Sequence, residues 1–321
     1  MILALAGGVG GAKLVHGFAQ VLQPQALVAA VNTGDDFEHL GWHICPDLDT
    51  VMYTLAGVAN PQTGWGLAGE SWRFMDTLEK LGGETWFRLG DQDLATHVRR
   101  TGLLRGGATL SEVTATLCMA QGIGVRVVPM SDAPVRTMVD TDEGELPFQS
   151  YFVRRRCEPV LRGLHFAGAT EASPSPAFRA ALDDPGLQAI VLCPSNPYLS
   201  IDPTLALPGV RDALRSASVP VVAVSPIVGG QAIKGPAAKI MRELGKTPSA
   251  LEVARHYGPL LDGFVLDHAD ADAARAVAAL GITPLVTATV MKDAGDRAQL
   301  ARELLDFVDR LARTAGAGAA A

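Results

Sequence analysis

The chain has 321 residues, of which 27 are basic and 34 acidic, giving a formal net charge of −7. Apolar residues make up 48% and charged residues 19%, a composition that excludes intrinsic disorder, collagen and a long coiled coil. The acidic balance argues against binding of duplex nucleic acid, which requires a basic face.

Neither a membrane segment nor a disulfide framework is indicated. The longest apolar runs, such as Ala26–Val31 and Val219–Val224, are far shorter than the ~20 residues of a membrane-spanning helix. The apolar stretch before Gly7 is too short for a signal peptide. We therefore expect a cytoplasmic protein. No CxxC pair occurs among the cysteines, which we expect to be reduced, namely Cys45, Cys118, Cys157 and Cys193.

Short, continuously apolar runs alternate with amphipathic segments along the chain. The runs are typical of strands that are covered on both faces, and they are Ile2–Ala6, Ala26–Val31, Val125–Pro129, Ala189–Cys193, Pro220–Val224, Phe264–Leu266 and Thr283–Thr287. Segments of helical length lie between many of them, including Lys13–Leu22, Leu48–Val58, Leu94–Arg100, Leu110–Gln121, Ala237–Leu244 and Ala271–Leu280. The alternation predicts an α/β, Rossmann-like three-layer fold with a mostly parallel sheet, in a single domain of residues 1–321.

Two regions depart from this alternation. Residues 46–121 are mostly helical in pattern and are expected to form a cap over one sheet edge. Residues 136–154 predict a β-hairpin insertion, with strands Thr137–Thr141 and Phe148–Val153 and a turn at Glu143–Gly144. Because projecting hairpins often mediate dimers, we expect a homodimer.

A glycine-rich loop follows the first predicted strand. Gly7, Gly8, Gly10 and Gly11 would let backbone N–H groups approach an anion at a helix N-terminus. The loop is not a P-loop, because Lys13 is not followed by Ser or Thr, and it lacks the third glycine of a dinucleotide fingerprint. A tight turn that binds nothing is the alternative interpretation.

Four aspartates fall within fifteen residues after the second predicted strand. Asp35 and Asp36 follow a Thr-Gly turn, and Asp47 and Asp49 would occupy the first turn of a helix. Helix capping explains one aspartate there but not all four. Since Mg²⁺ prefers oxygen ligands, we expect at least one of them to contact a metal ion.

Polar residues also follow later strands. Ser195-Asn196-Pro197 and Ser225-Pro226 come after buried strands, at the edge where open α/β sheets bind ligands. Arg88 precedes a predicted helix that contains Asp93 and His97. Asp93 suits a helix cap as well as a functional role, and His97 suits a packing residue as well as a functional role. Either one of Lys234 and Lys239, which follow the second loop, reaches a phosphate, or both lie on a solvated helix face.

Six motifs together resemble the 2-phospho-L-lactate transferases of coenzyme F-420 biosynthesis. Each is weak alone, but their order is specific over roughly residues 1–266, and they are AGGVGGAK (6–13), NTGDD (32–36), ICPDLDTVMYTLAG (44–57), LGDQDLATH (89–97), PSNPYLSI (194–201) and SPIVGG (225–230). The resemblance implies transfer of a phospholactyl, enolpyruvyl-phosphate or phosphoglyceryl group from a guanylylated diphosphate donor. The acceptor would be the ribityl hydroxyl of 7,8-didemethyl-8-hydroxy-5-deazariboflavin, with GMP released and Mg²⁺ required.

The resemblance also implies roles for particular residues. Asp49 and Arg88 match positions that contact the deazaflavin acceptor, while Gln92 stands where the family commonly has a charged residue. The guanosine nucleotide would be surrounded by Gly7, Gly8, Gly10, Gly11, Lys13, Ser195, Asn196, Pro197, Ser225 and Pro226. The metal region would comprise Asp35, Asp36 and Asp47.

For the reaction we expect direct attack of the acceptor hydroxyl on the acid-bearing phosphorus, because no nucleophilic triad is recognisable. Asp35 or its neighbours would hold Mg²⁺, and Asp49 would accept the hydroxyl proton. Two alternatives stay open: a non-enzymatic regulator that binds a nucleotide-sugar, as in the related gluconeogenesis factors, and an NAD(P) oxidoreductase. The missing third glycine disfavours the oxidoreductase.

Overall fold

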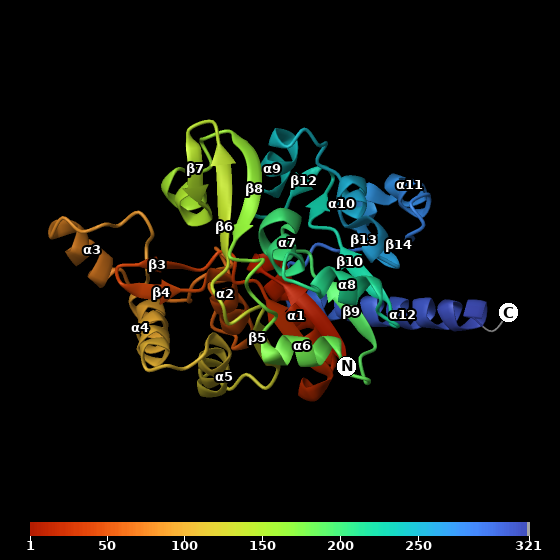
Figure 1. Ribbon diagram of the computed structural model, residues 1–321, viewed down its shortest axis with the longest axis horizontal. Coiled ribbons are helices and arrows are strands. Elements are labelled where there is room, and N and C mark those ends of the chain that lie inside the picture. The colour runs from red at the N-terminus through yellow and green to blue at the C-terminus, as the bar shows by residue number, and fades with distance from the viewer. Residues whose placement is uncertain (320–321) are drawn as a thin grey trace.

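The computed structural model describes residues 1–319, which are built around one large parallel sheet (Figure 1). All of its neighbouring strands pair in parallel. In sheet order its strands are β14 (Thr283–Thr287), β13 (Gly263–Asp267), β10 (Val221–Val224), β9 (Ala189–Leu192), β1 (Ile2–Ala6), β2 (Leu27–Val31) and β5 (Arg126–Pro129). These are the seven strands predicted from the apolar runs, and the expected α/β fold with a mostly parallel sheet is confirmed.

Strand β1 lies at the point where the strand order reverses. Ile2 pairs with Leu27 of β2 on one side and with Ala189 of β9 on the other. The chain first builds outward through β2 and β5, then returns to build through β9, β10, β13 and β14. Ligands of open α/β sheets bind at such a switch point, beyond the carboxyl ends of the strands.

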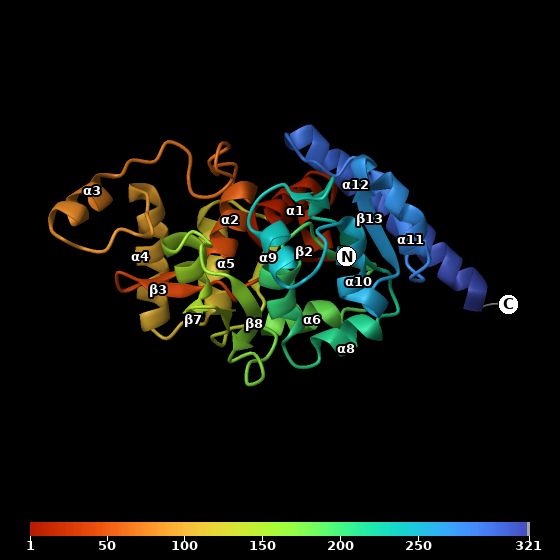
Figure 2. The same ribbon diagram turned by 90° about the horizontal axis from the view of Figure 1, so that it is seen from above.

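Two hydrophobic cores cover the two faces of the sheet. Alternate residues of β1 enter different cores, with Leu3 and Leu5 in one and Ile2 and Ala4 in the other. This is why the strands are apolar at every position instead of alternating. Figure 2 shows helices on both sides of the sheet.

On the Ile2 face, helix α1 packs against helices α2 and α12. The Cβ that Gly17 lacks would lie 2.2 Å from the backbone oxygen of Arg297, so the glycine permits close approach of α1 and α12. The bounds are α1 (Gly8–Val21), α2 (Pro46–Leu55) and α12 (Ala294–Ala319). The other core takes residues from α6 (Pro176–Leu182), α7 (Asp202–Leu205), α8 (Val210–Arg215), α9 (Ala237–Glu243), α10 (Ala250–Tyr257) and α11 (Ala274–Ala278).

Residues 46–121 hold four of the helices, and their outermost helix projects at one end of the molecule (Figure 1). After α2 these are α3 (Arg73–Lys80), α4 (Asp91–Arg105) and α5 (Leu110–Ala120). A small antiparallel pair, β3 (Phe37–His39) and β4 (Trp42–Ile44), precedes them and packs against α4. The remaining short elements are η1 (Pro24–Ala26), η3 (Pro197–Ile201), η4 (Gly258–Leu260), η5 (His268–Ala273), β11 (Ile227–Val228) and β12 (Gln231–Ala232).

The predicted hairpin exists, but its second strand was placed wrongly. Strand β6 pairs with β7 and also with a third strand, β8. The predicted strand Phe148–Val153 instead contributes to a helical turn, in which Phe148 and Tyr151 are buried and Phe148 stacks on Phe152. Spacings of three and four residues put these aromatics on one side of a turn, which a strand cannot do. The bounds are β6 (Arg136–Thr141), β7 (Gly144–Pro147), η2 (Ser150–Arg154) and β8 (Leu161–Ala167).

Over residues 1–319, no helix combines the length and apolar character required to span a membrane. The single catalytic domain and the homodimer stay predictions.

Candidate functional site

The glycine-rich segment that follows β1 is hydrogen-bonded to the loop that follows β9. Ser195 Oγ accepts a hydrogen bond from the Gly7 N–H at 3.1 Å and donates one to the Gly7 carbonyl at 2.8 Å. A Cβ on Gly10 would lie 2.1 Å from the Pro194 carbonyl oxygen, and one on Gly11 would lie 2.6 Å from Ser195 Oγ. Helix α1 begins at Gly8, so most of the predicted glycine loop is instead the first turns of this helix, and its glycines permit close contact with the loop after β9.

Asp47 lies at the N-terminal end of helix α1. Its Oδ1 accepts a 2.8 Å hydrogen bond from the Gly8 N–H, and its Oδ2 accepts one from Asn32 Nδ2 at 2.9 Å. Helix α2 begins at Pro46, which puts Asp47 in the first turn and directs it at this position. Burial raises the pKa of Asp47 to about 6, although the hydrogen bonds from Asn32 and Gly8 oppose the shift.

Asp35 and Asp36 are buried next to Asp47, and they carry oxygens without a hydrogen-bond partner in the protein. Oδ1 of each is unpartnered. Burial raises the pKa of Asp35 well above its usual range, and the nearby Asp47 and Asp36 raise it further. Asp36 Oδ2 accepts a hydrogen bond from Cys45 Sγ at 3.0 Å. Uncompensated carboxylate oxygens of this kind fit a Mg²⁺ ion, which would neutralise them.

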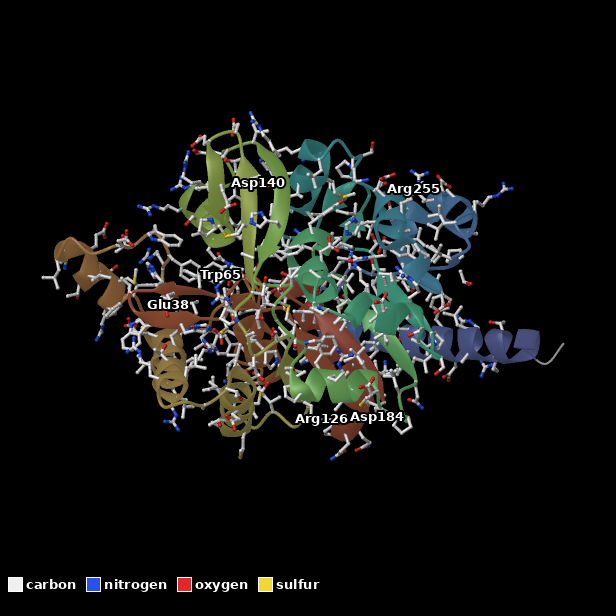
Figure 3. The ribbon with its side chains drawn as sticks, in the orientation of Figure 1. Glu38, Trp65, Arg126, Asp140, Asp184 and Arg255 are labelled. Carbon is white, nitrogen blue, oxygen red and sulfur yellow. The ribbon has the colours of Figure 1, made fainter. Side chains whose placement is uncertain are left out.

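Side chains close enough together to share a metal ion form three groups within the described part of the chain, and neither Asp35 nor Asp47 belongs to any of them. The last group is exposed on the hairpin sheet, where Figure 3 labels Asp140. The groups are Asp36–His43–Cys45, Asp49–Asp93–His97 and Asp140–Glu145–His165.

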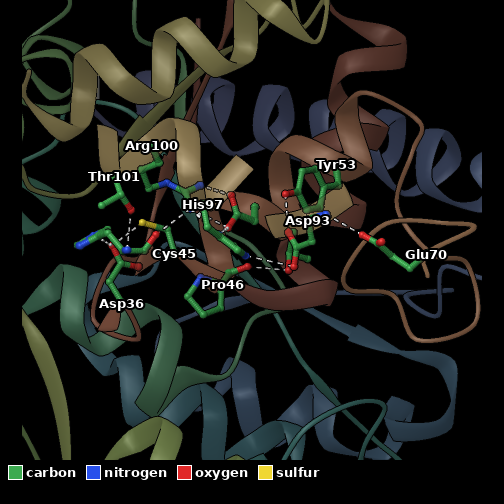
Figure 4. A network of polar contacts seen from close by, with 12 residues as sticks. Asp36, Cys45, Pro46, Tyr53, Glu70, Asp93, His97, Arg100 and Thr101 are labelled. Atoms are coloured by element: carbon green, nitrogen blue, oxygen red, sulfur yellow. Dashed lines mark hydrogen bonds and ion pairs between the residues drawn. The ribbon is translucent and has the colours of Figure 1, made fainter. Parts of the chain in front are cut away.

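Asp49 belongs to a buried polar network between α2 and α4 (Figure 4). Arg100 forms an ion pair with Asp49 Oδ1 and donates to Oδ2 at 3.1 Å. His97 Nδ1 lies 3.7 Å from Asp49 Oδ2, and its Nε2 lies 3.2 Å from Oδ2 of Asp93. The Tyr53 hydroxyl completes the network with a 2.6 Å hydrogen bond to Asp93 Oδ1.

Arg100 and Tyr53 were not predicted as site residues. For Asp93 and His97 the sequence allowed both a functional and a purely structural role. Asp93, His97 and Arg100 stand at i, i+4 and i+7, a spacing that places them on one face of helix α4. Charged residues must find partners when another helix covers the face on which they lie. The spacing of Asp93, His97 and Arg100 was therefore the sequence signal that could have identified this network.

Other predicted residues make local contacts instead of meeting Asp49. The Arg88 guanidinium lies 4.7 Å from the centre of the Trp72 ring and 3.4 Å from Asp76 Oδ1. Lys13 Nζ donates to the Met291 carbonyl at 2.7 Å, and burial is the main cause that lowers the pKa of Lys13.

The remaining predicted residues shape the loops after β9 and β10. Asn196 Oδ1 accepts hydrogen bonds from the N–H groups of Tyr198 and Leu199, while its Nδ2 is unpartnered. Pro197 is the first residue of η3. Ser225 Oγ closes the turn through Pro226 by bonding to the backbone N–H and carbonyl of Ile227.

Known proteins resemble the chain over nearly its full length. The family model described as 2-phospho-L-lactate transferase CofD matches residues 2–295. A phosphoenolpyruvate transferase of Streptomyces coelicolor is 41% identical over 316 residues, covering 97% of this chain and 98% of that protein. A 2-phospho-L-lactate transferase of Methanosarcina mazei is 38% identical over 269 residues, covering 84% of this chain and 88% of that protein.

Solved structures share the fold at low sequence identity. A protein from Bacillus halodurans superposes with a TM-score of 0.62 and 13% identity, covering 95% of this chain and 98% of the other. A second structure, described as a member of the upf0052 family from the same organism, gives a TM-score of 0.59 with 14% identity. The match to the family model and the identities above 30% show that the chain belongs to the CofD family of transferases.

Proposed function

We propose that the chain transfers a phospho-three-carbon-acid group from a guanylylated diphosphate donor to the ribityl hydroxyl of 7,8-didemethyl-8-hydroxy-5-deazariboflavin, in the biosynthesis of coenzyme F-420. One observation carries the proposal furthest. In a chain of the CofD family, buried Asp35 and Asp36 leave carboxylate oxygens unpartnered next to Asp47, beside the glycine loop. A diphosphate with its cation is the ligand class that such a combination suits.

The Mg²⁺ ion would be held in the region of Asp35, Asp36 and Asp47, whose carboxylates do not lie close enough together in this structure for all three to contact one ion directly. When bound, the ion would offset the charge of the diphosphate and of the departing GMP. Backbone N–H groups in the first turn of α1 would face the phosphates at the N-terminus of that helix. The side chains of Ser195, and of Ser225 with Pro226, would shape the walls of the nucleotide site through the turns that they close.

The acceptor hydroxyl oxygen would attack the phosphorus that carries the acid. A phosphorus–oxygen bond to the acceptor forms, the bond between that phosphorus and the GMP oxygen breaks, and one proton is released. Asp49 would accept this proton, held in orientation by Arg100 and His97. Positioning and charge neutralisation account for most of the rate in reactions of this class.

The names of the relatives favour an enolpyruvyl donor. Proteins named phosphoenolpyruvate transferase match 97% of the chain at 41% identity. The test is to offer the phospholactyl, enolpyruvyl and phosphoglyceryl guanylylated diphosphates together with the deazaflavin and Mg²⁺. GMP release is followed, and the product is identified by mass spectrometry. We expect the enolpyruvyl product to dominate.

The regulatory alternative predicts a different outcome. Nucleotide or nucleotide-sugar binding without GMP release, in the presence of acceptor and each of the three donors, would contradict the transferase proposal. The cytoplasmic location stays a prediction.

A further inference from the structure

A loop without helices joins α2 to α3 and contacts the first turn of α1. We call residues 57–72 the strap. An isolated bridge between Ala59 and Leu67 closes residues 60–66 into a smaller loop, which forms the tip of the strap. Four of its glycines, Gly57, Gly64, Gly66 and Gly69, have positive φ angles, so the backbone bends where other residues would be strained. Trp65, near the middle of the strap, is 53% exposed and is labelled in Figure 3.

The tip of the strap rests on the glycine loop. A Cβ on Gly64 would lie 2.7 Å from Cγ1 of Val9, which lies in the first turn of helix α1 within the glycine-rich segment. No atom outside its immediate neighbours would lie within 4 Å of a Cβ on Gly66, two residues further along. The contact with the glycine loop is therefore made at Gly64.

Lys234 binds backbone carbonyls of the same tip. Its Nζ donates to the Thr63 carbonyl at 2.9 Å and to the Gln62 carbonyl at 3.4 Å. Lys234 follows β12, in the segment that continues from Ser225 and Pro226. The tip thus lies between the two chain segments to which we assign the nucleotide.

The other end of the strap is anchored at the N-terminus of α4. Glu70 accepts hydrogen bonds from the Asp93 N–H at 2.7 Å and the Gln92 N–H at 2.9 Å, and the first of these contacts is drawn in Figure 4. Gln92 Nε2 donates to the Gly69 carbonyl at 3.2 Å. A carboxylate at a helix N-terminus is a favourable arrangement, so this end is the better fixed of the two. The exposed Lys234 contacts can break and re-form.

We propose that the strap is a lid over the transferred phosphorus, and that Lys234 is the positioning residue that holds it closed. The inference rests on the proposed function. With the strap closed, the acceptor hydroxyl attacks the acid-bearing phosphorus and GMP leaves. With the strap open, water attacks the same phosphorus, the bond to GMP breaks, and the free phospho-acid and GMP are released. Closure therefore favours transfer over hydrolysis by excluding water.

Hydrogen exchange of the free protein tests the contact without any turnover. In Lys234→Met the amides of residues 60–66 are expected to exchange at least threefold faster than in the wild type. Lys80→Met, which removes a cation from helix α3, is the matched control and should leave them unchanged. Equal exchange in Lys234→Met and wild type would overturn the role of Lys234.

A pair of glycine variants tests the contact at the tip. Gly64→Ala and Gly66→Ala both put a side chain at a positive φ, but only the first meets Val9. Gly64→Ala should raise exchange in residues 60–66 well above Gly66→Ala, and adding Val9→Ala should reverse the excess. Indistinguishable effects of the two glycine variants would overturn the placement of the tip.

Turnover then tests what closure does. GMP release is measured with the enolpyruvyl donor and Mg²⁺, with and without the deazaflavin. Lys234→Met should increase the ratio of hydrolysis to transfer at least fivefold, while Lys80→Met keeps the wild-type ratio. Faster exchange with an unchanged ratio would overturn the lid. Absence of GMP release by the wild type under both conditions would contradict the proposed function instead, and the exchange results would still decide whether Lys234 holds the strap.

Discussion

The backbone N–H of Gly8 donates a 2.8 Å hydrogen bond to Oδ1 of Asp47, so a carboxylate lies at the N-terminal end of helix α1. This end of a helix attracts anions, because its N–H groups point outward and the helix dipole favours negative charge. A phosphate that approaches the glycine loop therefore meets the charge of Asp47. A divalent cation held in this region would offset that conflict.

Asp47→Asn should make nucleotide binding less dependent on the cation. The amide oxygen can still accept from Gly8, but the negative charge is gone. In EDTA, we expect GDP to bind about fivefold more tightly than to the wild type, corresponding to about 1 kcal/mol of relieved repulsion. In excess Mg²⁺ the order should reverse. Calorimetric titration of GDP under both conditions checks this, and the same ratio of affinities with and without Mg²⁺ would contradict it.

Asp35→Asn should stabilise the cation-free protein and remove its response to Mg²⁺. Losing a buried, unneutralised carboxylate should increase the free energy of unfolding by about 1 kcal/mol. The wild type should gain about 2.7 kcal/mol at a Mg²⁺ concentration of one hundred times Kd, whereas the variant should gain little. Thermal unfolding with EDTA and with Mg²⁺ measures both effects. Asp212→Asn, at an exposed carboxylate, is the control and should keep the Mg²⁺ response.

Asp49→Asn should lower both turnover and stability. Arg100 would be left buried without its counter-ion, which typically costs about 3–5 kcal/mol. The double variant Asp49→Asn/Arg100→Met should recover part of the free energy of unfolding but none of the turnover. Urea unfolding and kcat are compared at a temperature where every variant is folded. Wild-type kcat and KM in Asp49→Asn would remove this residue from the mechanism.

The contribution of Asp47 to stability in EDTA should fall as pH rises between about 4 and about 6. Burial raises the pKa of Asp47 from 3.8 to about 6, so the folded protein keeps a proton that the unfolded chain has already lost. Asp35, whose pKa is also raised by burial, acts in the same direction. The free energy of unfolding, measured with urea across this pH range, should change less steeply with pH for Asp47→Asn than for the wild type. An identical slope would mean that Asp47 does not titrate in this window.

The central sheet could be predicted from the sequence because its strands are buried on both faces. A strand such as Ile2–Ala6 must be apolar at every position, and the glycines that follow it mark the end of the strand. The hairpin was predicted less accurately, because the aromatic residues after Pro147 suit a strand as well as a helical turn in composition. The burial of Phe148 and Tyr151 on the same side decided in favour of the turn.

The amino-acid sequence by itself determined the order of strands and helices, the positions of the glycine and aspartate motifs, and the family to which they point. The partners of those aspartates were decided by the tertiary structure. Arg100 is 51 residues from Asp49 in the chain, and Lys234 is 171 residues from Thr63. Local propensity and spacing carry no information on such distant contacts. They arise when the sheet brings the carboxyl ends of its strands to one edge and helices α2 and α4 pack together beside it. Buried charges and amides must then find partners among the groups within reach.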